Sequence, residues 1–359
     1  MKMNNKKFGI VEGGIEAFTV VQNTIWGVSS GSNALIKISM DTWTIEYIAE
    51  IPVSIDEKTN LFSNVFGYNN KLIFVPRSAE KIWTYDIKKQ EFSAIELDYD
   101  GVLENPMYVK EHKFAQAVVY GENLFLIACA YPAIIKLNLG NNEMEYVQEP
   151  LLKLDEKRNR VIGTGYFQCV SCEGEYIYAA CCSSKDVLKY SMKDGTYELI
   201  DVDMPFESFR WAICDKDTFI IEPYTEHNFY WYKKGREAFE IEGLKNCLSH
   251  NVINHEDEVY IFSYWQRSEG NIVKVDKNTK NISYLGNGVE GIKKAIEIDN
   301  VIYAITTTGS IMYSIENDEV KKHYLSFLNQ NTKEKLESKG EMIKEGNLSL
   351  QDFIDYVVS

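Results

Sequence analysis

Short apolar strands separated by polar turns run along almost the whole chain, and their arrangement repeats. A run of the type Asn70–Phe74 (NKLIF) is followed about ten residues later by a run of the type Asp186–Tyr190 (DVLKY), and then by a third. Apolar residues at the helical spacing i, i+3, i+4 form no longer stretch before residue 325, so the pattern predicts strands. The repeat occurs seven times, with anchor positions 41 to 52 residues apart at Trp26, Phe74, Leu126, Tyr178, Ile220, Ile261 and Tyr303.

Each repeat divides into four strands, which we letter A to D in chain order. The fourth repeat shows the division most clearly, because turn residues stand at Glu173-Gly174 and Asp194-Gly195. Glycine at these places suits the positive φ angles that tight hairpins need. The four strands predicted there are Tyr166–Cys172, Tyr176–Cys182, Val187–Met192 and Tyr197–Val202.

A period of about 40 to 50 residues built from short strands is typical of a β-propeller, in which each repeat forms one blade. We therefore predict an all-β protein, a seven-bladed β-propeller of four-stranded antiparallel blades with a short helical C-terminal tail. The propeller is expected to occupy residues 1–328 and the tail residues 329–359. The blades are expected to start near residues 15, 61, 113, 165, 208, 248 and 292.

The segment Ile36–Trp43 (IKISMDTW) is similar to the later half of a Kelch repeat. Together with the strand rhythm of all seven repeats, it makes the chain resemble the seven-bladed propellers of the Kelch, YVTN and NHL type. The paired glycines of a Kelch strand B and the Trp-Asp dipeptide are missing, so no specific family is assigned. The resemblance implies a binding site at the end of the central channel where the A strands begin, framed by the D–A and B–C loops.

The two ends of the chain do not follow the repeat. The last D strand is predicted at about Glu319–Phe327, and Phe8–Val11 is the candidate for closing the ring by adding to a blade edge. Farther on, Ser349 with Asp352 resembles an N-cap for a short amphipathic helix that carries Phe353, Ile354 and Val357. This tail either packs on the propeller or docks a protein partner.

Composition and charge limit the partners and the compartment. The net charge of −15 repels nucleic acid and anionic lipid, so we expect neither a nucleic-acid partner nor a membrane partner. We find no signal-peptide core at the start and no run of about 18 apolar residues. Seven cysteines, an odd number, suit reduced thiols better than a disulfide framework. We therefore expect a cytoplasmic protein.

Polar residues stand near the start of every predicted A strand, about ten residues before each anchor, and the chain then returns to apolar residues. As a set they predict a polar ring around the channel mouth. Three members carry or can carry positive charge on blades 5 to 7, which would attract a carboxylate or phosphate. The ring consists of Glu16, Asn64, Gln116, Gln168, Arg210, His250 and Lys294.

Loops on the same face extend the predicted site. Aromatic and arginine side chains suit a flat or peptide-like ligand, through stacking and paired hydrogen bonds. Added to the ring, the predicted ligand-binding residues are Arg77, Tyr131, Trp211, Glu222, Tyr224, Trp265 and Arg267. Long D–A loops at about Pro52–Asn60, Tyr99–Glu111 and Pro150–Gly163 are expected to wall one side of the mouth.

Motifs for metal or cofactor chemistry are weak. Cys169 and Cys172 have C-x-x-C spacing, but residues three apart on a strand point to opposite faces, so we predict no metal site. No phosphate loop or dinucleotide fingerprint occurs, and we expect no cofactor. Among the histidines, His250 lies on the ring, where it would act as an acid or base if the protein is an enzyme. Its partner would then be Glu16 or Glu222, and Arg210 would be the electrostatic stabiliser.

Three hypotheses for function follow. The first is a β-propeller whose channel mouth binds a small anionic ligand or a peptide segment. The second is a cofactor-free enzyme, a lyase, cyclase or hydrolase, that acts at the same mouth. The third is a scaffold that binds a protein partner through the propeller rim or the C-terminal helix. The fold alone does not decide between them, because propellers carry out all three roles.

Overall fold

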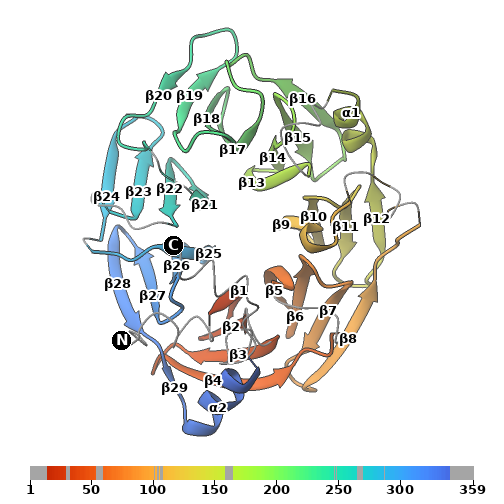
Figure 1. Cartoon of the computed structure of the whole chain (residues 1–359), viewed down its shortest axis with the longest axis vertical. Coiled ribbons are helices and arrows are strands. Elements are labelled where there is room, and N and C mark those ends of the chain that lie inside the picture. Colours follow the sequence, from red (N-terminus) through yellow and green to blue (C-terminus); the bar gives the residue numbers. More distant parts are fainter. Residues whose placement is uncertain are drawn as a thin grey trace, which may run out of the picture.

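In the computed structural model, described residues are 14–29, 33–53, 60–100, 102, 105, 108–157, 165–245, 247, 249–264, 270–286 and 288–339. They form seven antiparallel four-stranded blades arranged in a ring around a central axis, with a short C-terminal helix (Figure 1). The predicted seven-bladed β-propeller is confirmed. In every blade, the strands pair in chain order, and the first strand lies nearest the axis (Figure 1).

The strands have the following bounds. Blade 1 contains β1 (Ile15–Val21), β2 (Thr24–Ser29), β3 (Ala34–Ser39) and β4 (Thr44–Glu50). Blade 2 contains β5 (Phe62–Tyr68), β6 (Lys71–Pro76), β7 (Lys81–Asp86) and β8 (Glu91–Glu96). Blade 3 contains β9 (Phe114–Tyr120), β10 (Asn123–Ala128), β11 (Ile134–Asn138) and β12 (Met144–Val147). Blade 4 contains β13 (Phe167–Glu173), β14 (Tyr176–Cys181), β15 (Asp186–Ser191) and β16 (Tyr197–Asp201).

The remaining blades repeat the pattern. Blade 5 contains β17 (Phe209–Asp215), β18 (Thr218–Pro223), β19 (Tyr230–Lys233) and β20 (Phe239–Glu240). Blade 6 contains β21 (Ser249–His255), β22 (Glu258–Ser263), β23 (Ile272–Asp276) and β24 (Ile282–Leu285). Blade 7 contains β25 (Ile292–Ile298), β26 (Val301–Thr306), β27 (Ile311–Glu316) and β28 (Glu319–Tyr324).

Burial explains why the repeat is so regular. The second strand of every blade begins with one half-buried or exposed residue and continues with five buried ones, as in β6 and β10. These strands are covered on both faces because neighbouring blades pack against each other. One apolar cluster between blades 1 and 2 joins Trp26 to Phe74, and another joins Ile36 of blade 1 to Met312 of blade 7. The continuous apolar runs seen in the sequence are therefore the inter-blade core.

Two-residue turns fix the register of several hairpins. Asn69 and Asn70 connect β5 to β6 with φ angles of 46° and 62°, and Asp299 and Asn300 connect β25 to β26 with 51° and 63°. Positive φ at both central residues is the geometry whose twist matches antiparallel strands, and Asn and Asp tolerate it best among residues with side chains. Thus two-residue turns of this kind hold the A and B strands in pairs.

The ring of blades closes where blade 7 meets blade 1. The predicted strand Glu319–Phe327 is two strands: β28 ends at Tyr324, and β29 (Ser326–Phe327) leaves blade 7 and pairs in parallel with β4 of blade 1. Its register joins Ser326 to Thr44 and Phe327 to Ile45. The alternative candidate for closure, Phe8–Val11, lies outside the described residues.

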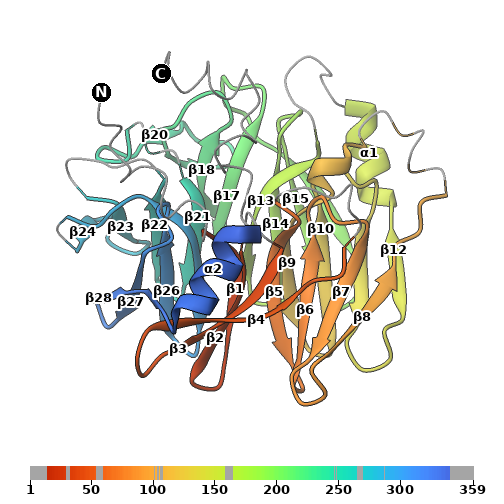
Figure 2. The same cartoon turned by 60° about the horizontal axis from the view of Figure 1, so that its bottom comes forward.

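A helix follows β29 and continues this closure. Helix α2 (Gln330–Lys339) begins after Asn329, whose side-chain Oδ1 accepts a hydrogen bond from the Thr332 backbone amide at 2.8 Å. It lies against β4 (Figure 2), and Leu336 is buried in the cluster that joins blades 7 and 1. The helix predicted to begin near Ser349 lies outside the described residues.

Two of the long D–A connections contain short helices. The connection before blade 4 begins with α1 (Glu149–Lys157), whose Leu151 and Leu154 are buried in the cluster between blades 3 and 4. The connection before blade 3 ends in the short 3-10 helix η3 (Lys110–His112). Part of the expected loop wall is therefore helical.

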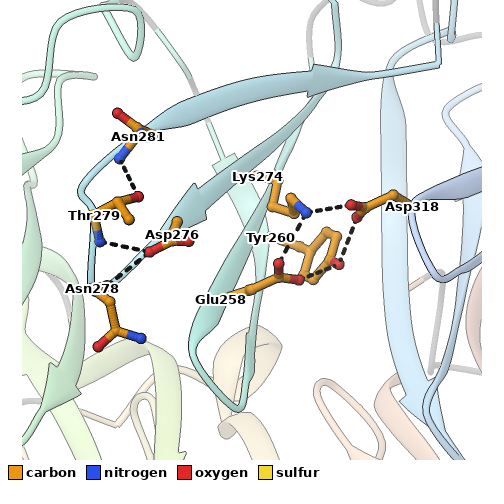
Figure 3. Close-up of polar contacts among 8 residues, drawn as sticks. All are labelled: Glu258, Tyr260, Lys274, Asp276, Asn278, Thr279, Asn281 and Asp318. Carbon is orange, nitrogen blue, oxygen red and sulfur yellow. Dashed lines mark hydrogen bonds and ion pairs between the residues drawn. The ribbon is translucent and has the colours of Figure 1, made fainter.

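A half-buried lysine, Lys274, links blade 6 to blade 7 on the face opposite the A-strand starts (Figure 3). Lys274 of β23 donates to Glu258 at 2.9 Å and also pairs with Asp318 in the β27–β28 turn. Tyr260 donates to the same two carboxylates, at 2.7 Å to Glu258 and 3.3 Å to Asp318. Lys274 therefore pairs with one carboxylate from each blade, and the Tyr260 hydroxyl bridges the same two carboxylates.

We expect Lys274→Met to lower the free energy of unfolding by about 1–3 kcal/mol, because hydrogen bonds to charged groups contribute that much and the two carboxylates lose their cation. Urea denaturation measures the change. Lys37→Met is the matched control, since Lys37 occupies the same strand position in blade 1 but pairs only with the exposed Glu46 at 3.6 Å. Equal losses in the two variants would contradict a special role for Lys274.

Candidate ligand-binding site

A β-bulge stands at the start of the inner strand in all seven blades. In six of them the residue after the first one has no partner on the second strand, and in blade 4 two residues are skipped. A bulge bends the strand and re-aims side chains, so two consecutive residues can face the same side. The second residues of the seven inner strands are Glu16, Ser63, Ala115, Gln168, Arg210, His250 and Lys293.

This bulge corrects the register of the predicted ring. Glu16, Gln168, Arg210 and His250 are indeed second residues, but Asn64, Gln116 and Lys294 are third residues of their strands. Counting a fixed number of residues back from the anchors takes no account of the extra residue. Consequently, Ser63, Ala115 and Lys293 are the true equivalents of Glu16.

A cavity of about 430 Å³ lies at this end of the channel. Its wall comes from the inner strands and adjoining loops of six blades, all except blade 5. Among the predicted residues, it contains Glu16, Arg77, Gln116, Gln168 and Lys294. It also contains Asn60, His112 and Tyr264, from D–A and B–C loops that were expected to frame the mouth. Three further polar residues of the wall were not predicted, namely Ser63, Asn251 and Lys293.

Two amides on the wall also hold neighbouring blades together. Gln116 accepts a hydrogen bond from the Val170 backbone amide at 2.7 Å, which links blade 3 to blade 4. Asn251 donates to the Lys293 carbonyl at 2.9 Å and accepts from the Ala295 amide at 3.2 Å, which links blade 6 to blade 7. The second clamp fixes the backbone that carries Lys293 and Lys294.

Charged groups in the cavity have strongly shifted pKa values. Burial raises the pKa of Glu16 to about 7, against the opposing effect of Lys293, Arg77 and Lys294. Burial likewise lowers the pKa of Lys294 to about 8, and its Nζ donates to the Ser63 carbonyl at 3.1 Å. The pKa of Lys293 is lowered too, again mainly by burial. At neutral pH the cavity therefore carries an excess of positive charge.

The histidine and the two cysteines on the wall, Cys129 and Cys169, are uncharged near neutral pH. Burial and then the positive charge of Arg77 lower the pKa of His112. Burial raises the pKa of Cys169 well above its usual range, which keeps it a thiol. All seven cysteines are free, and no group of three His, Cys, Asp or Glu in the described part of the chain is arranged to hold a metal ion.

Blade 5 places its own polar residues beside the cavity. Gln168 donates to the Tyr224 hydroxyl at 2.9 Å, and the Arg210 guanidinium lies over the Tyr224 ring at 5.4 Å from its centre. Arg210 Nη1 is 3.7 Å from Glu222 Oε1, and His227 Nδ1 is also 3.7 Å from that oxygen. Burial raises the pKa of Glu222 to about 7. We call Arg210, Glu222, Tyr224 and His227 the blade-5 cluster.

The structure corrects two of the predicted ligand contacts. Tyr131 is buried in the apolar cluster between blades 2 and 3, where its hydroxyl donates to the Asp98 carbonyl. Trp211 is fully buried between blades, and its indole N–H donates to the Ser249 carbonyl at 3.3 Å. Both are core residues, because the inter-blade space takes large aromatics whose polar atom finds a backbone partner.

Other predicted residues are placed only in part. Asn64 is not on the cavity wall, and its buried Oδ1 has no hydrogen-bond partner. Trp265 and Arg267 lie outside the described residues, and for His250 only the backbone, in β21, is described. Of the proposed catalytic set, the structure thus places Glu16 in the cavity and Arg210 in the blade-5 cluster.

Comparison with known proteins supports the fold and goes no further. No protein-family model matches the sequence, and no curated protein does. Among solved structures, virginiamycin B lyase from Staphylococcus aureus matches with a TM-score of 0.59 at 10% identity, covering 83% of this chain and 93% of the lyase. BamB from Moraxella catarrhalis matches with a TM-score of 0.53 at 13% identity, covering 83% of each chain. At such identities, the likeness is one of fold.

No helix in the described ranges is both long and apolar enough to cross a membrane.

Proposed function

We propose that the cavity binds a small anionic ligand, with a carboxylate or phosphate group held by Arg77, Lys293 and Lys294. The observation that carries this proposal is three cations on the wall of one cavity, faced by Glu16 as the acidic residue among the described wall residues. In a chain of net charge −15, such a local excess of positive charge focuses anions onto one place.

Partial burial of the three cations makes binding of an anion favourable. Charges taken out of water cost free energy unless an opposite charge and hydrogen bonds compensate them. Glu16 compensates incompletely, because its pKa of about 7 leaves it partly protonated near neutral pH. Phe62, Phe114 and Tyr264 on the wall supply apolar surface for the rest of a small ligand.

Removing one cation tests the proposal. We expect Lys294→Met to weaken binding of 4-oxopentanoate, a small carboxylate, by about tenfold, because a charge-assisted hydrogen bond contributes about 1.5–3 kcal/mol. Isothermal titration at one fixed pH measures it, with inorganic phosphate as a second probe. Lys136→Met is the control, since it removes the same charge from an outer strand of blade 3, where Lys136 pairs with Glu145.

Two outcomes would contradict this proposal. If the wild-type protein binds neither probe, the cavity is not an anion site. If it binds both but Lys294→Met behaves like Lys136→Met, the anion is held elsewhere.

A specific observation also favours catalysis at the same place. Glu16, with a pKa of about 7, and Lys294, with a pKa of about 8, line one cavity. An acid and a base poised near neutral pH are what cofactor-free proton transfer requires. We therefore infer as the second candidate a lyase, cyclase or hydrolase reaction on the bound anion, with Glu16 in place of His250 as the acid or base.

A further inference from the structure

This inference rests on the proposed function and concerns the blade-5 cluster beside the cavity. The fold fixes the two charged members opposite each other. Arg210 is the bulged second residue of β17, and Glu222 on β18 pairs across from Trp211, the residue that follows the bulge. The register of the blade therefore fixes the backbone positions of both residues.

The polar atoms of this pair lack hydrogen-bond partners. Arg210 Nε and Nη1 and both carboxylate oxygens of Glu222 are buried and unpartnered. The side chain of Arg210 is 9% exposed and that of Glu222 is fully buried, and their closest atoms are 3.7 Å apart, too far for a hydrogen bond. His227 Nδ1, at the same distance from Glu222, is unpartnered as well. A buried donor and a buried acceptor thus lie side by side with hydrogen-bonding capacity unused.

The charges of the pair decide which group suits it. A second carboxylate would be repelled by Glu222, and an ammonium group would be repelled by Arg210. A neutral group with an acceptor next to a donor satisfies both residues, since its carbonyl accepts from Arg210 and its N–H donates to Glu222. A primary amide has this arrangement, because its C=O and one of its N–H bonds point the same way, and hydrogen bonds to charged partners are the stronger ones.

The cluster is continuous with the anion site. Gln168 is on the cavity wall and also donates to Tyr224, whose ring lies against Arg210. The pKa of the Cys169 thiol on the same wall is raised mainly by burial. The charge of Glu222 from blade 5 raises it further, and the charges of Arg210 from blade 5 and Lys294 from blade 7 oppose this. Both groups of charges therefore border one stretch of the channel mouth.

We propose that the ligand is a carboxylate that also bears a primary amide: its carboxylate is held by Lys293 and Lys294, and its amide accepts from Arg210 and donates to Glu222. Blade 5, which contributes nothing to the wall of the cavity itself, then supplies selectivity. The cations supply the attraction.

Two probes that differ in one group test this proposal. Succinamate (4-amino-4-oxobutanoate) carries a carboxylate and a primary amide, and 4-oxopentanoate is the same chain with CH₃ in place of the NH₂. We expect the wild-type protein to bind succinamate about tenfold more tightly than 4-oxopentanoate, the ratio that one hydrogen bond to a buried carboxylate gives. In the double variant Arg210→Met with Glu222→Met, which leaves no unpaired buried charge, this ratio is expected to fall to about one.

The outcomes separate the two proposals. Equal binding of the two probes by the wild-type protein would overturn this inference while leaving the anion site intact. Binding of neither probe would overturn both. A ratio near ten that persists in the double variant would also overturn the inference, because the amide would then be recognised elsewhere. The double variant Lys81→Met with Glu96→Met, which removes an exposed pair on the outer strands of blade 2, is the control. The wild-type ratio needs no variant to fold.

Discussion

Raising the pH from about 6 to about 9 is expected to weaken binding of 4-oxopentanoate by about a hundredfold, because two groups in the cavity change charge in the same direction. Glu16, with a pKa of about 7, is neutral at the low end and becomes negative as the pH passes that value. Lys294, with a pKa of about 8, then loses its positive charge. Each step adds about 1.4 kcal/mol or more of unfavourable electrostatic free energy, which is tenfold in affinity.

Burial sets the direction of this pH dependence. Burial disfavours the charged form of any group, so the carboxyl pKa moves up and the ammonium pKa moves down until both fall in an accessible range. Glu222 in the blade-5 cluster titrates near the same pH as Glu16, and its ionisation also opposes a bound anion. The carboxylate of the probe stays ionised throughout, so the whole pH dependence belongs to the protein.

Titration calorimetry across this pH range measures the profile. Glu16→Gln is expected to reduce the step near pH 7 without removing it, since Glu222 remains, and Lys294→Met is expected to remove the step near pH 8. Glu46→Gln, on the outer strand of blade 1, serves as the control and should reproduce the wild-type curve. A flat wild-type profile would show that Glu16 and Lys294 do not face the bound anion.

The sequence was sufficient for the architecture because the core of a propeller is repetitive. Five consecutive buried residues in the second strand of each blade leave an apolar run that cannot be mistaken for an amphipathic helix. Turn residues such as Asn69-Asn70 mark where the strands end. Strand number, order and blade boundaries all depend on these local signals.

The site was harder to predict because it depends on departures from the repeat. The bulge at each inner-strand start inserts one residue, so a fixed spacing from the anchors does not reach the same position of the strand in every blade. Ten residues before Tyr303 and Ile261 stand Lys293 and Asn251, but the predicted ring used the adjacent residues, Lys294 and His250. A useful signal would have been two consecutive polar residues at the start of an otherwise apolar strand, as in Lys293-Lys294.

Aromatic residues illustrate a second limit. Tyr131 and Trp211 have the composition of a binding surface, yet both are core residues whose single polar atom is satisfied by a backbone carbonyl. Tyr224, of the same residue type, contacts Gln168 and Arg210 through its hydroxyl and ring. Only the packing between blades separates these cases, and that packing is a long-range property.

Truncation after Leu325 is expected to lower the free energy of unfolding by at least about 3 kcal/mol, because it removes the elements that close the ring. It deletes β29 and its pairing with β4, including the hydrogen bond from the Leu328 amide to the Ile45 carbonyl at 2.8 Å. It also exposes the cluster that Leu336 covers, and loss of one buried leucine side chain costs about 2–5 kcal/mol. Without this closure, the described residues retain no strand pairing between blades 7 and 1.

Thermal and urea denaturation of three chains, namely the full chain, residues 1–325 and residues 1–339, measure this effect. Chain 1–339 keeps β29 and α2, so it separates closure from any contribution of residues 340–359. Within the full chain, Leu336→Ala is expected to reproduce most of the loss, whereas Leu328→Ala, at a leucine that is 51% exposed, is expected to change stability by less than about 0.5 kcal/mol.

If chain 1–325 is as stable as chain 1–339, blades 7 and 1 hold the ring by themselves, and β29 with α2 has another purpose. If the loss appears and the anion affinity of chain 1–325 is unchanged, closure at the rim and binding at the channel mouth are energetically independent, as expected for a propeller whose inner strands are clamped by Gln116 and Asn251.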